Sequence, residues 1–147
     1  MVPYIAERFI AFSIPDDRRL FVISYEGIHE LNLGPEISVQ SDFSCPEGVG
    51  AFNGKKISYK QFEGPTLGLY GGTPILVRDS CEVLDLKAPE HPASDDGTVE
   101  LWGPDGELLE TLPFVDYSGD WQCATFSTDY RHIVIGTPYT VAIYHRG

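Results

Sequence analysis

Histidine is the residue type of this chain best suited to acid–base or metal chemistry, and it occurs four times. His29 precedes Glu30, but no second histidine follows at the spacing that a zinc-binding H-E-x-x-H helix requires. We therefore expect His29 to be a strand-surface residue. The other three are scattered along the chain, at His91, His132 and His145. This spacing favours structural roles over metal ligation and predicts neither a metal site nor a cofactor.

The nucleophilic residues form no catalytic pattern. The three cysteines are odd in number and lack C-x-x-C spacing, which argues against a disulfide framework and against a zinc site: Cys45, Cys81 and Cys123. We expect buried, inert thiols, because none stands in an electropositive setting that would favour the thiolate. Ser118 lacks the preceding glycine of a G-x-S-x-G elbow. The sequence therefore predicts no catalytic residues and a protein that is not an enzyme.

Carboxylates dominate the charge of the chain. Ten Lys and Arg residues stand against 22 Asp and Glu residues, for a net charge of −12. Residues 79–120 hold twelve of the acidic residues and a single base, Lys87. Because a nucleic-acid binder needs clustered cations, we expect no binding to DNA or RNA. The acidic segment is typical of a solvated face, and its field would also attract a basic partner.

The apolar residues form short runs rich in β-branched and aromatic types, which predicts strands. The clearest runs are 9–12, 20–23, 99–102, 132–135 and 141–144. Turn sequences separate them, and the chain contains 15 Gly and 11 Pro residues. The longest apolar runs have four residues, whereas a membrane helix needs about 20. We expect one all-β domain over residues 1–147, with no membrane partner.

Two further stretches carry local structural signals. Asn53-Gly54 fits the type I′ turn of a hairpin, so we predict a hairpin with arms 49–52 and 55–62. Residues 75–88 contain neither Gly nor Pro, and Val83, Leu84 and Leu86 could face a core from either a helix or a strand; we predict strand there.

An internal repeat is the most informative feature of the sequence. The first copy spans residues 10–33 and the second spans residues 124–145. Each begins with a β-rich run ending in Phe-Ser, at Phe12-Ser13 and at Phe126-Ser127, and continues through a polar turn into two further runs. The segment between the Ser and the next strand is two residues longer in the first copy than in the second. Because two is an even number, the apolar residues of the next strand would stay on the same face in both copies. The repeat predicts two similar three-strand units.

These copies resemble β-propeller blades of the WD40 type. In that family Phe-Ser and a polar turn close the first hairpin, as in 126–129, and an apolar strand with a near-terminal Trp forms the third strand, as in 99–102. Residues 98–112 look like the outer hairpin of such a blade, and the next blade would start at Trp121. The resemblance covers about half of the chain. It implies antiparallel hairpins and meanders arranged as propeller-like blades in a small or incomplete propeller.

Closure of such a propeller has several solutions. Propellers have about 4–8 blades of about 40–45 residues, more than this chain can supply, and an open arc would expose two apolar faces. Val2–Ala6 could supply an outer strand after 141–145 in a small closed ring. The alternatives are a homo-oligomer that closes the propeller, a larger propeller of which this chain is a piece, or an unrelated β-sandwich or barrel.

The resemblance implies a non-enzymatic protein-interaction or scaffold module. In such blades the loops between second and third strands, and between successive blades, lie at one rim. Exposed Tyr is an effective interface anchor. The expected partner-binding residues are Tyr25, Tyr117, Asp120, Trp121 and Tyr139.

Two other functions stay open. A small acidic inhibitor or immunity-type protein would bind a basic partner surface through residues 79–120. A carbohydrate-binding module would use Tyr and Trp platforms, with Trp121 as the first candidate. The N-terminal residues show no signal-peptide pattern, so a cytoplasmic location is expected.

Overall fold

A computed structural model describes residues 8–79 and 81–146 of the chain. Over these residues the protein is all-β, as predicted, with thirteen strands, one short 3-10 turn (Pro46–Gly48) and no α-helix. The strands are β1 (Phe9–Ser13), β2 (Arg19–Ser24), β3 (Ile28–Leu33), β4 (Ile37–Asp42), β5 (Lys56–Tyr59), β6 (Phe62–Gly68), β7 (Val77–Arg78), β8 (Glu82–Lys87), β9 (Asp96–Trp102), β10 (Leu108–Val115), β11 (Cys123–Phe126), β12 (His132–Gly136) and β13 (Val141–His145). All five of the clearest predicted strands are confirmed.

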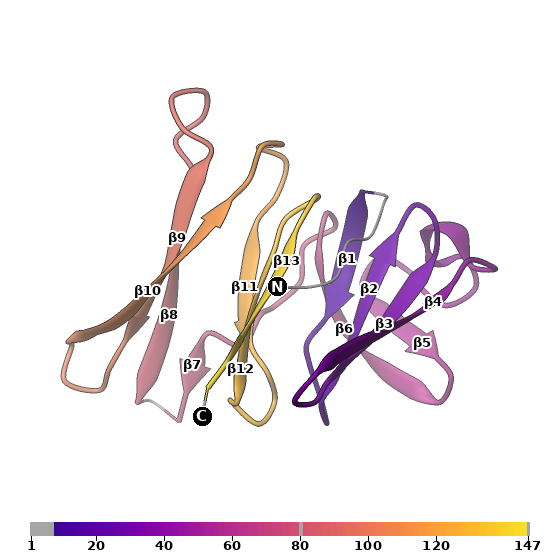
Figure 1. Cartoon of the computed structure of the whole chain (residues 1–147), viewed down its shortest axis with the longest axis horizontal. Coiled ribbons are helices and arrows are strands. Elements are labelled where there is room, and N and C mark those ends of the chain that lie inside the picture. Colours follow the sequence, from indigo (N-terminus) through magenta and orange to yellow (C-terminus); the bar gives the residue numbers. More distant parts are fainter. Residues whose placement is uncertain (1–7, 80, 147) are drawn as a thin grey trace.

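The strands form three antiparallel sheets. The six-stranded sheet has the order β4-β3-β2-β1-β6-β5, the four-stranded sheet β10-β9-β8-β7, and the three-stranded sheet β11-β12-β13. Figure 1 shows the sheets as three layers, with the three-stranded sheet in the middle. No sheet closes on itself within the described residues, since each has two edge strands.

The core lies in two layers, one on each side of the middle sheet. On one side Val134 packs with Phe12 of the six-stranded sheet. On the other side Phe126 packs with Val99 of the four-stranded sheet. Every residue of β12 is buried. A strand covered on both faces has no solvent side, which explains why β12 is a continuous apolar run without polar alternation.

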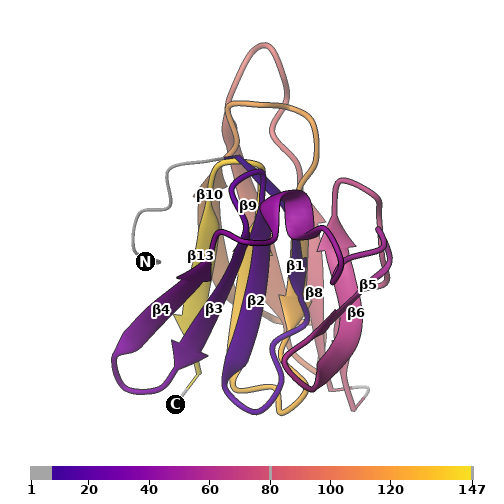
Figure 2. The ribbon, with the colours of Figure 1, turned by 90° about the vertical axis from the view of Figure 1, so that its right-hand side faces the viewer.

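The outer face of the six-stranded sheet is covered by the chain itself. Phe21 and Ile23 point to this face, and residues 45–62 bring Ile57 and Phe62 against them. Figure 2 views this side and shows the short 3-10 turn in front of the sheet. Burial of Ile57 is complete. The expectation that both ends of an open stack expose apolar faces is therefore wrong at this end.

The outer face of the four-stranded sheet is open. Asp85 lies directly opposite Glu100 across two strands, and the Lys87 ammonium is 3.0 Å from the Asp85 carboxylate. Below this polar area, four apolar residues lie in direct register across the four strands. We call this set the apolar row: Val77, Val83, Trp102 and Leu108. Three of them are 41–48% exposed, and Trp102 is half-buried.

The predicted repeat is a pair of three-strand meanders, β1-β2-β3 and β11-β12-β13. Phe12 lies opposite Val22 and Phe126 lies opposite Ile133, so these pairs are equivalent. This register makes the turn of the first copy three residues longer than that of the second, where the sequence comparison gave two. The sequence comparison was wrong because run boundaries do not define pairing register. The outer strand expected at Val2–Ala6 lies outside the described residues.

The predicted hairpin at Asn53-Gly54 is only partly correct. A turn is present: Asn53 Oδ1 accepts the N–H groups of Lys55 and Lys56, each at 2.9 Å. It is not of type I′, because that type needs positive φ at both Asn53 and Gly54, and of these two only Gly54 has it (φ 91°). The first arm makes a single isolated bridge to β5 rather than a strand. The second arm stops at Tyr59, because Lys60 and Gln61 both adopt left-handed conformations (φ 46° and 65°) and reverse the chain into β6. Neither residue is a usual former of such a turn, so the sequence carried no signal.

The strand prediction for residues 75–88 is confirmed at β7 and β8. Just before β7, the chain crosses to the middle sheet. The N–H of Ile75 donates to Thr125 Oγ1, and the N–H of Phe126 donates to the Ile75 carbonyl, both at 2.9 Å. This crossing ties the six-stranded half of the protein to both other sheets.

Candidate functional site

The loops predicted to form a rim lie at one end of the sheets. Tyr25 is in the β2–β3 turn, Tyr139 in the β12–β13 turn, and Tyr117 and Asp120 in the β10–β11 loop. All three loops are at the upper end in Figure 1, because β2, β10 and β12 all run toward it. The three tyrosines are 43%, 54% and 72% exposed at positions 25, 139 and 117.

Arg8 connects three of these predicted residues. Its guanidinium forms an ion pair with Asp120 and lies 5.6 Å from the centre of the Tyr139 ring. Its backbone carbonyl accepts the N–H of Tyr25 at 3.2 Å. The ion pair is partly exposed, so it stabilises the fold by about 1 kcal/mol at most. Its effect is to hold loops of two sheets beside each other.

Trp121, the fifth predicted residue, is in the core. It is 9% exposed and stacks on Phe12 with 6.4 Å between ring centres, in the layer between the six-stranded and middle sheets. A buried indole cannot serve as an exposed platform for a sugar or a partner. Trp121 precedes β11 directly, and the sequence gives no indication of whether such a residue faces the core or solvent.

A cleft of about 710 Å³ adjoins Tyr25, and sequence reasoning missed the residues on its other wall. Leu69 and Tyr70 form a two-residue turn closed by backbone hydrogen bonds between Gly68 and Gly71, at 3.0 and 3.2 Å. This turn leaves Leu69 45% and Tyr70 65% exposed. Phe52 lines the same cleft and lies 6.1 Å from the Tyr70 ring. The Gly-Leu-Tyr-Gly sequence is a signal that could have identified this turn.

His29 is buried, which corrects the expectation of a strand-surface residue. It is 1% exposed, and its ring lies between Ser24 Oγ at 2.8 Å and Ser41 Oγ at 2.7 Å. Ser24 Oγ also accepts the N–H groups of Glu26 and Gly27. The Ser24 hydroxyl must then donate to Nε2, which leaves His29 Nδ1 as the donor to Ser41. An imidazole in this tautomer cannot deprotonate Ser41, so the arrangement is structural.

The remaining chemical candidates are inert or dispersed. Burial raises the pKa of the Cys123 thiol to about 11, which keeps it protonated. Cys45 is half-buried and Cys81 is exposed, so the expectation of buried thiols is wrong for Cys81. Among residues 8–79 and 81–146, no group of three or more His, Cys, Asp or Glu side chains could hold a metal ion.

Two of the acidic residues of 79–120 are buried and do not belong to an exposed acidic face. Glu82 is buried, where it pairs with Arg146 at 2.6 Å and Arg78 at 3.1 Å. Asp116 is also buried; burial raises its pKa, but hydrogen bonds from Gln122 and Ser118 outweigh this and lower it overall. These carboxylates serve internal contacts and contribute little field at the surface. The outer face of the four-stranded sheet keeps the Asp85–Glu100 pair described above.

Comparisons with protein-family models, with curated proteins and with solved structures found no match to this chain. Within the part of the chain that the structure describes, no helix is long and apolar enough to cross a membrane. Function must therefore be inferred from the stacked antiparallel sheets and from the residues gathered at their ends.

Proposed function

We propose that this chain is a non-enzymatic protein-interaction module built from propeller-like repeats. The observation that carries the proposal is a set of exposed aromatic and aliphatic side chains that four loops present at one end of the sheets. We call this set the aromatic rim: Tyr25, Leu69, Tyr70, Tyr117 and Tyr139. Exposed aromatic side chains beside a cleft are the usual anchors of protein–protein contacts.

The arrangement of the sheets supports a propeller-like interpretation. Strands β1–β4, β7–β10 and β11–β13 are three antiparallel meanders in which each strand pairs with the next along the chain. The meanders pack face to face, as blades do. In a blade, the loop between the second and third strands lies at one rim, and this is where Tyr25 and Tyr139 stand in the two repeats.

The charge at the rim favours a basic partner. Arg8 is neutralised by Asp120, and Lys55 is the cation that lines the cleft beside Tyr25. Carboxylates in the neighbouring loops and at the start of β9 outnumber these cations: Glu26, Glu47, Glu90 and Asp96. The partner would insert an apolar side chain into the cleft and place Lys or Arg around it, which speeds association and sets orientation.

A loss-of-binding experiment tests this surface. The immobilised chain is compared with a triple variant, Tyr25→Ser, Tyr70→Ser and Tyr139→Ser, and with a control variant of exposed residues outside both the rim and the apolar row, Leu76→Ser with Leu109→Ser. We expect wild type and control to retain a basic protein that the rim variant loses. With the purified partner, the rim variant should bind at least about 30-fold more weakly, as for hot-spot residues. Equal retention by all three would exclude the rim.

The outer face of the four-stranded sheet supports a second candidate function, the acidic inhibitor. Asp85 and Glu100 lie directly opposite each other there, with only Lys87 as a neighbouring cation. The double variant Asp85→Lys and Glu100→Lys should then abolish binding of a basic partner while the rim variant leaves it intact. A partner lost by the rim variant alone would instead assign binding to the rim.

The apolar row supports the proposal that chains associate in pairs. A row of exposed side chains in register across all four strands is a surface that a second copy can cover with its own row, since a twofold interface uses the same patch on both subunits. This contact would close the open end of the stack and leave the aromatic rim free.

A further inference from the structure

A second cleft, of about 460 Å³, lies at the opposite end of the protein from the aromatic rim. It opens between the six-stranded and middle sheets. Three turns form its walls: β1–β2 with Arg18, β3–β4 with Pro35, and β11–β12 with Asp129 and Arg131. Its size is within the range of about 300–1,000 Å³ found for small-molecule sites.

Two histidines that are 13 residues apart in the sequence meet in this cleft. His132 and His145 are directly paired across β12 and β13, with His145 Nδ1 3.3 Å from His132 Nε2. His132 is 5% exposed. Burial lowers its pKa, and the charges of His145, Arg18 and Arg131 lower it further, against an opposing effect of Asp129. Arg18 and Arg131 line the cleft together with His132.

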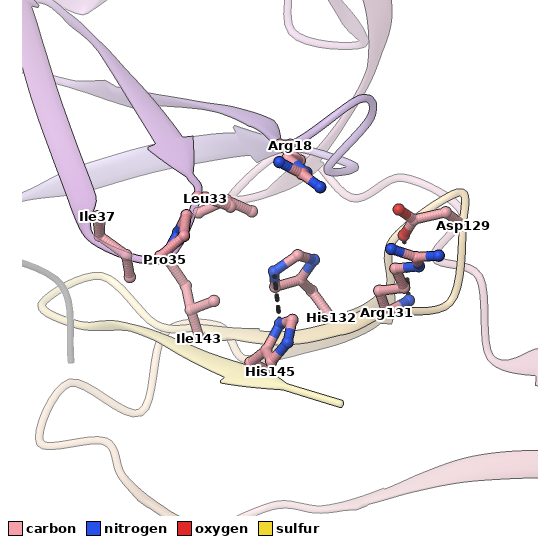
Figure 3. Close-up of a pocket in the computed structure, with 10 residues that line it drawn as sticks. Arg18, Leu33, Pro35, Ile37, Asp129, Arg131, His132, Ile143 and His145 are labelled. Atoms are coloured by element: carbon pink, nitrogen blue, oxygen red, sulfur yellow. Dashed lines mark hydrogen bonds between the residues drawn. The ribbon is translucent and has the colours of Figure 1, made fainter. Parts of the chain in front are cut away.

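The two arginines outnumber the one carboxylate that lines the cleft with them, Asp129. Within the described residues, neither Arg18 nor Arg131 forms a side-chain ion pair. The Asp129 carboxylate instead accepts Ser127 Oγ–H at 2.6 Å and the backbone N–H of Arg131 at 3.0 Å, so both guanidinium groups keep their hydrogen-bond donors for a ligand. Figure 3 shows the Arg18 guanidinium directed across the cleft toward His132. The cleft therefore carries a net positive charge, although the chain as a whole has a net charge of −12.

The rest of the cleft is apolar. Leu33 and Ile37 come from strands β3 and β4, Ile143 comes from β13, and Pro35 lies between the first two. Their side chains line the wall on the opposite side of the histidine pair from Arg131 in Figure 3. A ligand that fills the whole cleft must therefore have one anionic end and one apolar end.

We propose that this cleft binds a small organic anion, with a carboxylate or phosphate group held by Arg18, Arg131 and the histidine pair, and with an apolar body against Leu33 and Ile143. Guanidinium groups bind both types of anion through charge-assisted, bidentate hydrogen bonds. A neutral His132 can add one further ring N–H. The site is separate from the aromatic rim, and its function does not depend on the partner proposed there.

A metal ion is the alternative ligand for a histidine pair, and the surroundings disfavour it. Zinc sites need three or four donors, whereas this pair has no third ligand group among the described residues. Two guanidinium groups against one carboxylate, Asp129, would also repel a cation. The same two groups favour an anion, so the charge of the cleft discriminates between the two classes of ligand.

The test uses three probes of similar shape: benzoate, phenyl phosphate and the neutral benzamide. Binding is followed by NMR of the His132 and His145 ring signals, assigned with His132→Gln and His145→Gln variants. We expect saturable shifts with at least one anion and none with benzamide, and the stronger anion identifies the head group. Equal shifts with benzamide, or no saturable shift with either anion, would overturn the proposal.

Charge variants give a second, independent measurement. Arg18→Gln and Arg131→Gln should each weaken the better anion about tenfold, the usual effect of losing one charge-assisted contact. Lys55→Gln removes the same charge at the opposite end and should leave the affinity unchanged. Arg18 and Arg131 are exposed, so both variants should unfold at the wild-type temperature. If Lys55→Gln weakens anion binding as much as the arginine variants do, the effect comes from the overall charge of the chain, and the proposal of a specific site at Arg18 and Arg131 is contradicted.

Discussion

Ser13 and Ser127 make the same hydrogen bond in the two repeats: each Oγ accepts a backbone N–H from the next strand, that of Phe21 in β2 at 2.9 Å and that of His132 in β12 at 3.0 Å. Both serines are buried. The bond closes the first hairpin of each meander and satisfies a backbone N–H that water cannot reach. The two meanders therefore share this hydrogen bond at equivalent positions, although their first turns differ in length.

Loss of either hydroxyl should destabilise the protein. Ser13→Ala and Ser127→Ala each leave a buried N–H without an acceptor, and we expect each to lower the free energy of unfolding by about 1–3 kcal/mol. Ser127→Ala should have the larger effect, because Ser127 Oγ also donates to Asp129 at 2.6 Å. Urea titration measures both, with the exposed Ser38→Ala as control. Values equal to that of the control would show that the bonds contribute nothing.

Replacement of Trp121 should destabilise the protein strongly, whereas replacement of Tyr117 should have little effect on stability. Trp121→Ala empties a site in the core beside Phe12 and should cost about 3–5 kcal/mol of unfolding free energy. Tyr117→Ala changes a side chain that is 72% exposed and should cost about 0.5 kcal/mol or less. Thermal unfolding followed by circular dichroism compares the two. Similar melting temperatures for the two variants would contradict the placement of Trp121 in the core.

Stability should fall with acid below pH 6.5 because of His29. Burial lowers the pKa of His29 from its ordinary value of 6.5, so the folded state binds the proton less readily than the unfolded chain. The stability is therefore fully present above pH 6.5 and is lost as the pH falls below it, by at most about 1.4 kcal/mol per pH unit for one histidine.

Unfolding titrations between pH 7.5 and pH 5 measure this dependence. His29→Gln should have a shallower slope than wild type, although its stability at pH 7.5 is lower. Ser38→Ala, which changes an exposed side chain that does not titrate, should keep the wild-type slope. Parallel slopes for wild type and His29→Gln would show that His29 does not titrate in this range.

Light scattering tests association through the apolar row. We expect the wild-type chain to have a mass above 16.3 kDa that rises with concentration. Val83→Lys places a charge in the centre of the row and should return the mass to that of one chain. Val49→Lys, at an exposed site in a loop of the six-stranded sheet, is the matched control and should not. A wild-type mass of 16.3 kDa at every concentration would exclude pairing.

Local patterns were sufficient to predict most of the strands, though not β4 or β6, and several turns. The runs 9–12 and 132–135 are apolar and β-branched, and a run of that kind has few ways to bury itself other than as a strand. The hairpin of β9 and β10 follows from two such runs around Asp105-Gly106. These features depend on residues near one another in the chain, and a single sequence contains that information.

What only the tertiary structure decided is which strands face one another and where each side chain points. The sequence by itself determined an all-β protein with a repeated meander and an acidic surface. It could not show that His132 and His145 meet, because cross-strand pairs depend on register. It could not place Trp121 in the core, since burial there comes from Phe12, more than 100 residues away in the chain. Sheet packing is a long-range property, and the two clefts proposed as binding sites are its products.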